Sequence, residues 1–428
     1  MQLPERVKKY LSKQNISTWQ IETDSKKLFN NIIVIPALEE SKNVKRLLQS
    51  IEENDKKYLT ETLLIFIVNN SEKHNLKVKE DNLKLLDYLK KHKTKNPILH
   101  IGIIDAVSEN KMLPEKEGGV GFARKIGMDL SLAFFDYSNN KKKILISLDA
   151  DCTVSKNYLE RIVTDFNKNN YSAGYVNFEH VLPENTEEQK AIVNYEIFLR
   201  YYVLGLKYAN SPYAFHTVGS TIICDYENYI KVGGMNKRKA GEDFYFMEKL
   251  AKVANINEIK SATVYPSSRI SNRVPFGTGQ RINRFLLGER NEYLLYSPKI
   301  FEVLKNWLDV FNNKNLTAKE YLNEAKEINI ELYNFLLQQS FYNNWTKIVE
   351  NSKTDIQLAK QKKIWMDGFK TLKLIHYLTD NEFPKENMFF ALNYLFEKTK
   401  TINEINNKEL LPPLVTQLKY LKLLKEII

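Results

Sequence analysis

Short apolar runs alternate with amphipathic segments along the first 265 residues of this chain. Four to eight apolar residues bounded by turn residues predict buried strands, and apolar residues recurring every three or four positions predict helices. Strands and helices that alternate in this way predict a doubly wound α/β sheet. The predicted strands are 31–36, 63–68, 98–104, 143–148, 174–178, 218–224 and 261–265, and the predicted helices are 44–51, 83–89, 121–130, 158–166 and 187–208.

The pattern changes after about residue 285, where strand-like runs stop and nearly every segment has helical periodicity. Thr317 and Glu320 form a capping box ahead of an amphipathic helix. We therefore predict three parts: an N-terminal extension over residues 1–30, an α/β domain over 31–285 and a helical C-terminal domain over 286–428. The fold class is α/β, a mixed, mostly parallel sheet flanked by helices and followed by an all-α region.

The last residues, 414–428, place Leu418, Leu421, Leu424 and Ile428 on one helical face. Such a stripe fits either a helix lying on a membrane surface or a terminal helix docked on its own domain. The docked helix is the more common case, and it is the interpretation we favour. Peripheral membrane contact through this helix is the alternative.

The chain has 428 residues and a formal net charge of +11, from 63 basic against 52 acidic residues. The basic residues are spread out, unlike those of a nucleic-acid-binding arm, so no nucleic-acid partner is expected. With two cysteines, no visible secretory signal and no run long enough to span a membrane, the expected location is cytoplasmic, with peripheral attachment at the inner membrane face as the variant.

Two carboxylates, Asp149 and Asp151, follow the apolar run 143–148 directly. In open α/β sheets, ligands bind at the carboxyl ends of the strands. Paired hard oxygen donors at that edge suit Mg²⁺ or Mn²⁺ carrying a phosphate-bearing substrate. The alternative is structural, because aspartates often end strands and cap helices.

Five motifs along the chain resemble those of family 2 glycosyltransferases of the GT-A fold, in that family's order. Ile35-Pro36-Ala37-Leu38-Glu39-Glu40 resembles the first-strand motif, and Val68-Asn69-Asn70-Ser71 occupies the place of Val-Asp-Asp-Gly-Ser. Ala123-Arg124-Lys125-Ile126-Gly127 is similar to the Ala-Arg-Asn-x-Gly helix. Asp149-Ala150-Asp151 stands at the metal motif, and Gly233-Gly234-Met235 with Gly241-Glu242-Asp243 resembles the closing pair of motifs.

The resemblance implies an inverting, metal-dependent transferase that moves a sugar from a nucleotide diphosphate to a hydroxyl acceptor. It implies that Asp151 binds the metal, that Asp149 binds the ribose or a metal-bound water, and that Asp243 is the base, with Glu242 orienting acceptor or donor. The structural alternative for Glu242 and Asp243 is that they complement a helix dipole. Donor contacts are implied for Pro36, Ala37, Glu39, Asn69, Asn70 and Arg124.

Departures from the family pattern refine these expectations. Asn69 and Asn70 replace carboxylates, and amides suit uracil better than guanine, so a UDP-linked donor is favoured. No histidine follows Asp243 until His376, so the metal would be held by an aspartate, phosphates and water. His180 and His216 could replace the missing histidine ligand, but a lone histidine is more often structural.

Arg269 and Arg273 lie in an irregular segment, residues 266–281, with three arginines and two glycines. Such a segment fits a loop that closes over the diphosphate, and equally a solvated basic loop. Two other functions stay open: a nucleotidyltransferase acting on sugar phosphates, and a non-catalytic module that binds nucleotide sugars.

Overall fold

The structure is a computed structural model that describes residues 3–93, 97–270, 277–402, 405 and 407–428. Its contacts divide the chain into two compact units. The first unit is built from the described parts of residues 1–181 and 217–269, and the second from those of 182–216 and 277–428. The two units are therefore interleaved along the sequence, because the chain leaves the first unit near residue 181 and returns to it near residue 217.

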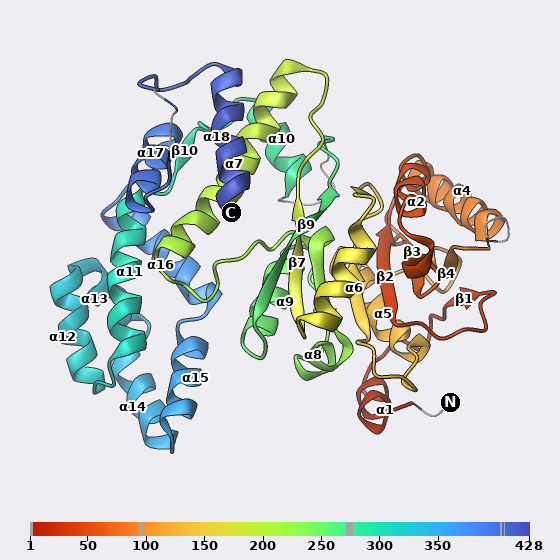
Figure 1. Ribbon diagram of the computed structural model, residues 1–428, viewed down its shortest axis with the longest axis horizontal. Helices are drawn as coiled ribbons and strands as arrows, with labels where there is room; N and C mark the ends of the chain where they lie inside the picture. The colour runs from red at the N-terminus through yellow and green to blue at the C-terminus, as the bar shows by residue number, and fades with distance from the viewer. Residues whose placement is uncertain (1–2, 94–96, 271–276, 403–404, 406) are drawn as a thin grey trace. The chain divides into compact units, whose positions relative to one another are not determined.

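The described part of the first unit contains a nine-stranded sheet with the order β1-β4-β3-β2-β5-β8-β7-β9-β6 (Figure 1). Strands β4, β3, β2 and β5 run parallel to one another, and β8 is antiparallel to both of its neighbours. Most paired residues lie in parallel ladders. The strands are β1 (Glu22–Thr23), β2 (Asn31–Ala37), β3 (Thr62–Asn69), β4 (His100–Ala106), β5 (Ile144–Ser147), β6 (Thr153–Val154), β7 (Ala173–Phe178), β8 (Ile222–Asp225) and β9 (Ile256–Tyr265).

Helices cover both faces of this sheet. Apolar residues of α2, α4 and α6 share one core with Ile33 of β2 and Phe66 of β3. Because side chains alternate across a strand, Val34 and Ile67 point to the opposite face, where they meet Gly127 of α5. The helices of this unit are α1 (Glu5–Leu11), α2 (Val44–Glu52), α3 (Lys56–Leu59), α4 (Leu76–Lys93), α5 (Val120–Ser131), α6 (Tyr158–Lys168), α8 (Tyr226–Lys231) and α9 (Glu242–Ala251).

The order of the strands reverses between β2 and β5. From β2 the chain adds β3 and then β4 on one side, and it then crosses to place β5 on the other side of β2. The two strands are paired in parallel, with Val34 opposite Ser147. Such a switch point opens a crevice at the carboxyl ends of the two strands. The residues that follow β2 and β5 are therefore placed where a ligand can bind.

Helix α1 is fastened to the first unit by a buried polar network. The Tyr10 hydroxyl donates to Asp129 Oδ1 at 2.7 Å, and the Tyr229 hydroxyl donates to the same oxygen at 2.7 Å. Lys125 Nζ lies 2.8 Å from Asp129 Oδ2. The Asp129 carboxylate is fully buried, so these partners replace the water that it loses. They hold α5 against α1 and α8.

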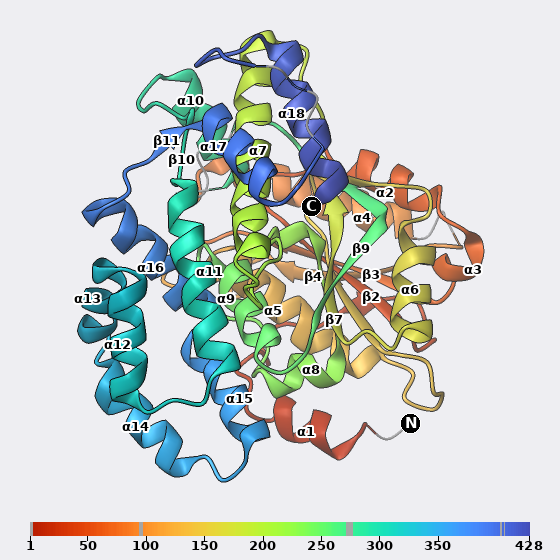
Figure 2. The ribbon, with the colours of Figure 1, turned by 60° about the vertical axis from the view of Figure 1, so that its left-hand side comes forward.

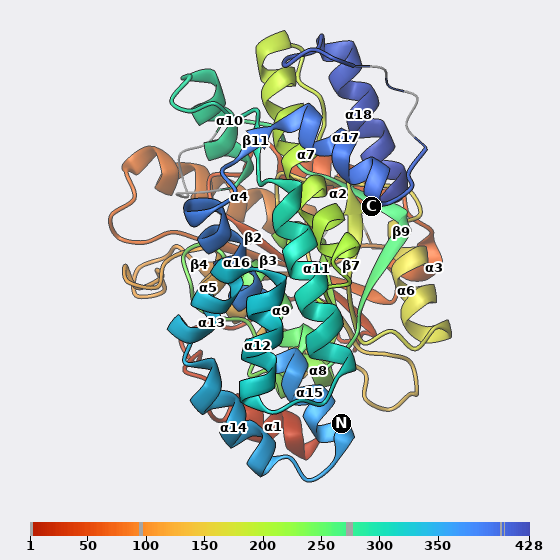
Figure 3. The ribbon, with the colours of Figure 1, turned by 90° about the vertical axis from the view of Figure 1, so that its left-hand side faces the viewer.

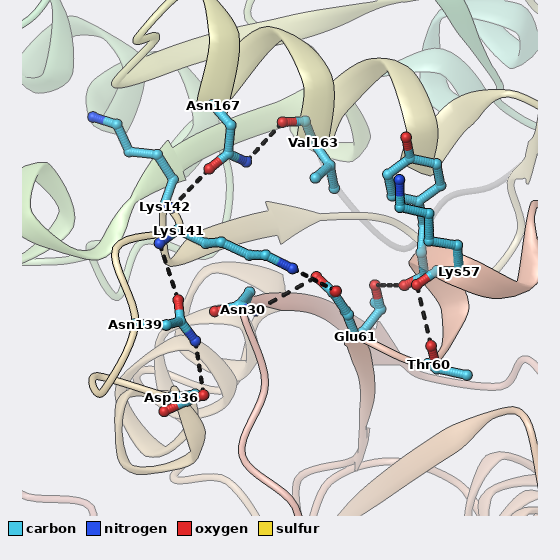
Figure 4. A network of polar contacts seen from close by, with 12 residues as sticks. Asn30, Lys57, Thr60, Glu61, Asp136, Asn139, Lys141, Lys142, Val163 and Asn167 are labelled. Atoms are coloured by element: carbon cyan, nitrogen blue, oxygen red, sulfur yellow. Dashed lines mark hydrogen bonds and ion pairs between the residues drawn. The ribbon is translucent and has the colours of Figure 1, made fainter.

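A second polar network lies at the amino-terminal end of β5 (Figure 4). Lys141 Nζ lies 2.6 Å from Glu61 Oε1, and the Lys142 amide donates to Asn167 Oδ1 at 3.0 Å. A cavity of about 230 Å³ lies beside this network, lined by Tyr137, Asn139–Lys143, Asp225, Tyr226 and Glu227. It is at the far end of β5 from Asp149 and Asp151, so it is not part of the predicted site.

The second unit is helical around an aromatic core. Trp307, Phe311, Tyr321, Phe341 and Trp345 are buried and contact one another. The helices, seen in Figure 3, are α7 (Thr186–Tyr208), α10 (Thr278–Leu286), α11 (Pro298–Asn313), α12 (Ala318–Ile328), α13 (Ile330–Gln338), α14 (Phe341–Asn351), α15 (Asp355–Trp365), α16 (Gly368–Asn381), α17 (Met388–Lys398) and α18 (Leu414–Ile427). The short strand β10 (Leu294–Leu295) pairs with β11 (Glu386–Asn387).

The C-terminal helix α18 lies along α7 within the second unit (Figure 2). Leu421, Leu424 and Ile428 of its apolar stripe are buried, and Lys425 Nζ lies 3.7 Å from the buried Glu196 Oε1. The stripe is therefore occupied by its own unit, as the docked alternative predicted. Among the described residues, none of the helices combines the length and the apolar character needed to traverse a bilayer.

The predicted fold class is confirmed: a mixed, mostly parallel sheet flanked by helices is followed by a helical region. The capping box at Thr317 and Glu320 is also confirmed. The predicted strand 218–224 is wrong in its first half, because Gly219–Thr221 forms a 3₁₀ turn before β8. Strand β9 begins five residues earlier than expected, at Ile256. The predicted domain boundaries stay a prediction, although contacts group α7 with the later helices.

Candidate active site

Three acidic side chains follow the adjacent strands β2 and β5. Glu40 comes three residues after β2 ends, and Asp149 and Asp151 come directly after β5. The Cys152 amide donates to the Asp149 carbonyl oxygen at 3.2 Å, which closes a turn at the strand end. The turn holds both aspartates at the carboxyl edge of the sheet, as the sequence predicts.

Arg124 joins two of the predicted site residues that are far apart in the sequence. Its Nη2 donates to Asp149 Oδ1, and its Nη1 donates to Glu242 Oε1. The Arg124 side chain is 3% exposed and that of Glu242 is 5% exposed, so this is a buried clamp. Burial acts to lower the pKa of Arg124, but the nearby carboxylates of Asp149 and Glu242 outweigh it and keep the guanidinium charged. The clamp therefore fixes the start of α9 against the end of β5.

A second arginine joins another pair of carboxylates. Arg269, which follows β9, donates through Nη2 to Glu40 Oε1, and the same nitrogen lies 3.1 Å from Asp151 Oδ2. Glu40 also accepts from Asn43 Nδ2 at 2.6 Å. Burial raises the pKa of Glu40 and that of Asp151, and Arg269 opposes the rise in both. The guanidinium thus supplies positive charge between two crowded carboxyl groups.

Asp243 lies at the start of α9, beside Glu242. Gly241 precedes the helix with a positive φ of 70°, so the chain turns sharply before the two acids. The Phe244 amide donates to Asp243 Oδ1 at 2.7 Å. Burial, followed by the like charge of Glu242, raises the pKa of Asp243 to about 7. Arg124 and Asp149 both act electrostatically on Asp243, so its carboxyl belongs to the same site.

The ends of β2 and β3 are tied together by Asn82 of α4. Its Oδ1 accepts from the Glu39 amide at 2.9 Å, and its Nδ2 donates to the Asn69 carbonyl at 3.1 Å and to Asn70 Oδ1 at 3.2 Å. Glu39 has a positive φ of 57°, which is uncommon outside glycine and marks a sharp turn after β2. The Asn70 amide is used inside the protein, whereas the Asn69 side chain makes no hydrogen bond within the described residues.

The remaining predicted residues are spread more widely. Pro36 and Ala37 are buried at the end of β2. They form the strand end that leads to Glu39 and Glu40. His180 and His216 are buried, and neither joins a cluster of metal-binding side chains among the described residues. Arg273 lies outside the described residues.

The carboxylates fit a divalent cation bound together with phosphate. Asp149 and Asp151 offer the hard oxygens that Mg²⁺ and Mn²⁺ prefer. Within the part of the chain that the structure describes, no three histidine, cysteine or acidic side chains come close enough to hold a metal alone. A cation at Asp151 would relieve the crowding with Glu40. It would also leave coordination positions for phosphate oxygens and water, which Mg²⁺ readily keeps.

Two residues of the site were missed by the sequence analysis. Glu40 was considered only as part of the first-strand motif, yet it is the side chain that accepts from Arg269. For Glu39, the contact that the structure shows is that of its backbone amide with Asn82. The place of Glu40 as the last residue of the segment that resembles the first-strand motif was the signal that could have found it. Asn82 sits inside a helical stretch without any motif, and its role follows only from the contact of α4 with the ends of two strands.

Comparisons with known proteins identify no family for this chain. No family model matches it, and no curated protein matches it. Among solved structures, S. aureus TarS 1-349 in complex with UDP-GlcNAc is 12% identical and has a TM-score of 0.41, over 76% of this chain and 91% of that one. Mannosyltransferase PcManGT from Pyrobaculum calidifontis in complex with GDP-Man and Mn²⁺ is 13% identical, with a TM-score of 0.33, over 88% of this chain and 92% of that one.

A third solved structure, GalNAc-T7 with UDP, GalNAc and Mn²⁺, is 15% identical, with a TM-score of 0.35, over 71% of this chain and 55% of that one. With TM-scores below 0.5, these likenesses carry no argument about this chain.

Gly219 lies against the Arg124 guanidinium, so a substitution there tests whether the position of this guanidinium matters. A Cβ atom at Gly219 would lie 2.7 Å from Arg124 Nη1 and 2.8 Å from Nη2. We expect Gly219→Ala to displace the guanidinium and to lower kcat/KM of a reaction at this site on the order of 10²-fold, as misplaced catalytic groups do. Steady-state kinetics of the purified chain would measure this.

Gly102→Ala is the matched control for Gly219→Ala. A Cβ there would lie 2.7 Å from Ile21 Cγ2, a similar clash in the middle of β4 and away from the carboxylates. We expect this control to lose stability without losing activity per folded molecule. Equal losses of activity in the two variants would contradict the importance of the clamp.

Proposed function

We propose that this chain transfers a sugar from a nucleotide diphosphate donor, preferably UDP-linked, to a hydroxyl acceptor, with inversion at the anomeric carbon and with Mg²⁺ or Mn²⁺. The observation that carries the proposal is the clamp of Arg124, which brings Asp149 and Glu242 to one site next to Asp243. Three segments that resemble glycosyltransferase motifs thereby converge at one edge of one sheet. Chance motif matches would not be expected to meet through one buried guanidinium.

The chemistry assigns a separate task to each side of the site. Asp151 and Asp149 would hold the divalent ion, which when bound supplies positive charge to the departing diphosphate. Asp243 accepts the proton of the acceptor hydroxyl while the oxygen of that hydroxyl bonds to the anomeric carbon. The bond from that carbon to the diphosphate oxygen breaks with its electron pair leaving on the nucleotide. A single displacement of this kind inverts the anomeric carbon.

The alternative of a nucleotidyltransferase receives no support from the end of β2. Such an enzyme needs a glycine-rich, basic phosphate loop after its first strand. Here the strand is followed by Glu39 and by the buried Glu40, which accepts from Asn43 and Arg269. We therefore keep glycosyl transfer as the one proposed reaction.

The test is a panel of nucleotide sugars incubated with the purified chain, with Mn²⁺, Mg²⁺ or chelator, and with a mixture of hydroxyl acceptors. Release of the nucleoside diphosphate that depends on the metal is the expected result. Release of pyrophosphate would indicate nucleotidyl transfer instead. Binding of a nucleotide sugar by calorimetry, without any turnover on the panel, would indicate a non-catalytic module.

The raised pKa of Asp243 predicts the pH dependence of transfer. Below pH 7 the carboxyl is protonated and cannot accept the acceptor's proton, and above pH 7 it is ionised. We therefore expect kcat/KM to rise with pH on the acid side and to level off above about pH 7, the region to which burial also raises the pKa of Glu40 and Asp151. A profile measured at fixed free metal concentration checks this. A midpoint near the ordinary aspartate value of about 3.9 would contradict it.

A further inference from the structure

Three consecutive basic residues, Lys237, Arg238 and Lys239, come shortly before Glu242 and Asp243. All three are exposed. The proposed reaction does not use them, since the donor side of the site is built from the ends of β2, β3 and β5. We ask what ligand such a group of cations would bind beside the proposed base.

The backbone of this basic loop is fixed close to the acids. Asn236 Nδ2 donates to the Glu242 carbonyl at 2.9 Å, and Asn236 Oδ1 accepts from the Arg238 amide at 3.1 Å. The loop also lies directly on the first turn of α5. A Cβ at Gly121 would be 2.3 Å from the Arg238 carbonyl oxygen, and one at Gly119 would be 2.7 Å from Lys239 Cα. The cations therefore have a defined place next to the start of α9.

The three side chains differ in how their charges are balanced. Lys237 Nζ lies 2.8 Å from Glu117 Oε2 and 4.7 Å from the Phe122 ring centre. The Arg238 guanidinium lies over the Tyr245 ring at 3.8 Å. Within the described residues, neither Arg238 nor Lys239 has a carboxylate partner. In the part of the chain that the structure describes, two charges thus remain without a carboxylate, one of them on a guanidinium stacked over an aromatic ring.

We propose that Arg238 and Lys239 bind an anionic group, a phosphate ester or a carboxylate, on the acceptor that receives the sugar. A planar guanidinium offers two parallel donors to phosphate or carboxylate oxygens, and a neighbouring ammonium adds charge. The loop is joined to the same helix start as Asp243, so an anion held there places the neighbouring hydroxyl group of the acceptor near the base. This inference rests on the proposed function, because it takes Asp243 to mark the acceptor side.

The same chemistry has a second source, the diphosphate of the donor. The two sources are separable, because donor turnover can be measured with water as the acceptor. If the loop binds the acceptor, its removal leaves donor hydrolysis unchanged. If it binds the donor, its removal lowers hydrolysis and transfer together.

The experiment compares the full chain with a double variant, Arg238→Gln with Lys239→Gln. The matched control is Arg161→Gln with Lys168→Gln, which removes one arginine and one lysine from the exposed side of α6. The acceptors are glucose, glucose 6-phosphate and glucuronate, used with the donor that the panel identifies. Kinetics give kcat/KM for each acceptor and for hydrolysis alone, and calorimetry gives the binding of glucose 6-phosphate.

We expect the wild-type chain to favour the anionic acceptors over glucose by about tenfold or more, as charge-assisted hydrogen bonds allow. The double variant should lose this preference and keep its rate of hydrolysis, and the α6 control should keep both. Absence of a preference in the wild type, or a parallel loss of hydrolysis in the double variant, would overturn the proposal. If no donor is turned over, the proposed reaction fails, and calorimetry still decides whether the double variant alone loses the phosphate ester.

Discussion

The Asp243→Asn variant should transfer sugar about 10² to 10⁴-fold more slowly than the wild-type chain, the usual contribution of a general base. An asparagine has nearly the same shape, and its oxygen can still accept from the Phe244 amide, but it cannot take up the acceptor's proton. The effect should therefore appear in kcat with little change in the binding of the donor. Initial rates at saturating donor, with donor affinity measured by calorimetry, would establish this.

The control for this substitution is Asp165→Asn on α6. Asp165 makes a local hydrogen bond with Asn169 at 3.2 Å and lies away from the clamp, so its loss should not affect transfer. A full rate in Asp243→Asn would require another base. Neutralisation should also remove the contribution of Asp243 to the pH dependence near 7, whereas Glu40 and Asp151, whose pKa burial also raises to about 7, are unchanged in this variant.

Arg124→Met should strongly destabilise the first unit. It leaves the carboxylates of Asp149 and Glu242 without their common partner, and removing one side of a buried ion pair costs about 3–5 kcal/mol of the free energy of unfolding. Asp149 is one-third exposed, so we expect the lower end of that range. Transfer should also be lost, since the start of α9 is no longer held at the sheet edge.

Urea unfolding combined with hydrogen exchange would measure this loss, because protection of the β2 and β5 amides reports on the first unit alone. Arg161→Met on α6 replaces an exposed arginine, and its effect should stay within about 0.5 kcal/mol. Arg124→Lys keeps one charge but cannot reach both carboxylates in the same way. A stable and active Arg124→Met variant would show that the clamp has no role in folding or transfer.

Much of the fold was predictable because the strands of a parallel sheet are buried on both faces. Their continuous apolar runs, such as Ile32 to Ile35, lack the polar positions of an exposed segment and therefore indicate buried strands. The 3₁₀ turn at Gly219–Thr221 was mistaken for strand because it runs directly into the apolar residues Ile222 and Ile223, whereas in the structure Gly219 packs closely against the Arg124 guanidinium. Short edge strands such as β1 and β6 depend on their partners and leave little trace in the sequence.

The site was predictable to the extent that motifs fix residue types at strand ends. Asp149, Asp151 and Glu242 could be named because each directly follows a strand or begins a helix. The pairing of carboxylates by Arg124 and Arg269 could not be derived, since Arg124 and Glu242 are 118 residues apart and Arg269 and Glu40 are 229 residues apart. For the same reason Glu40 was overlooked in favour of Glu39, as only the turn after β2 decides which of the two points inward.

The interleaving of the two units constrains how this polypeptide can mature during synthesis. Strand β9 lies between β7 and β6, so the sheet of the first unit is incomplete until residue 265 has left the ribosome. By then α7 has already emerged, and its apolar positions must wait for partners that follow residue 277. A nascent chain that stalls between residues 265 and 277 would expose the apolar positions of α7, to which chaperones can bind.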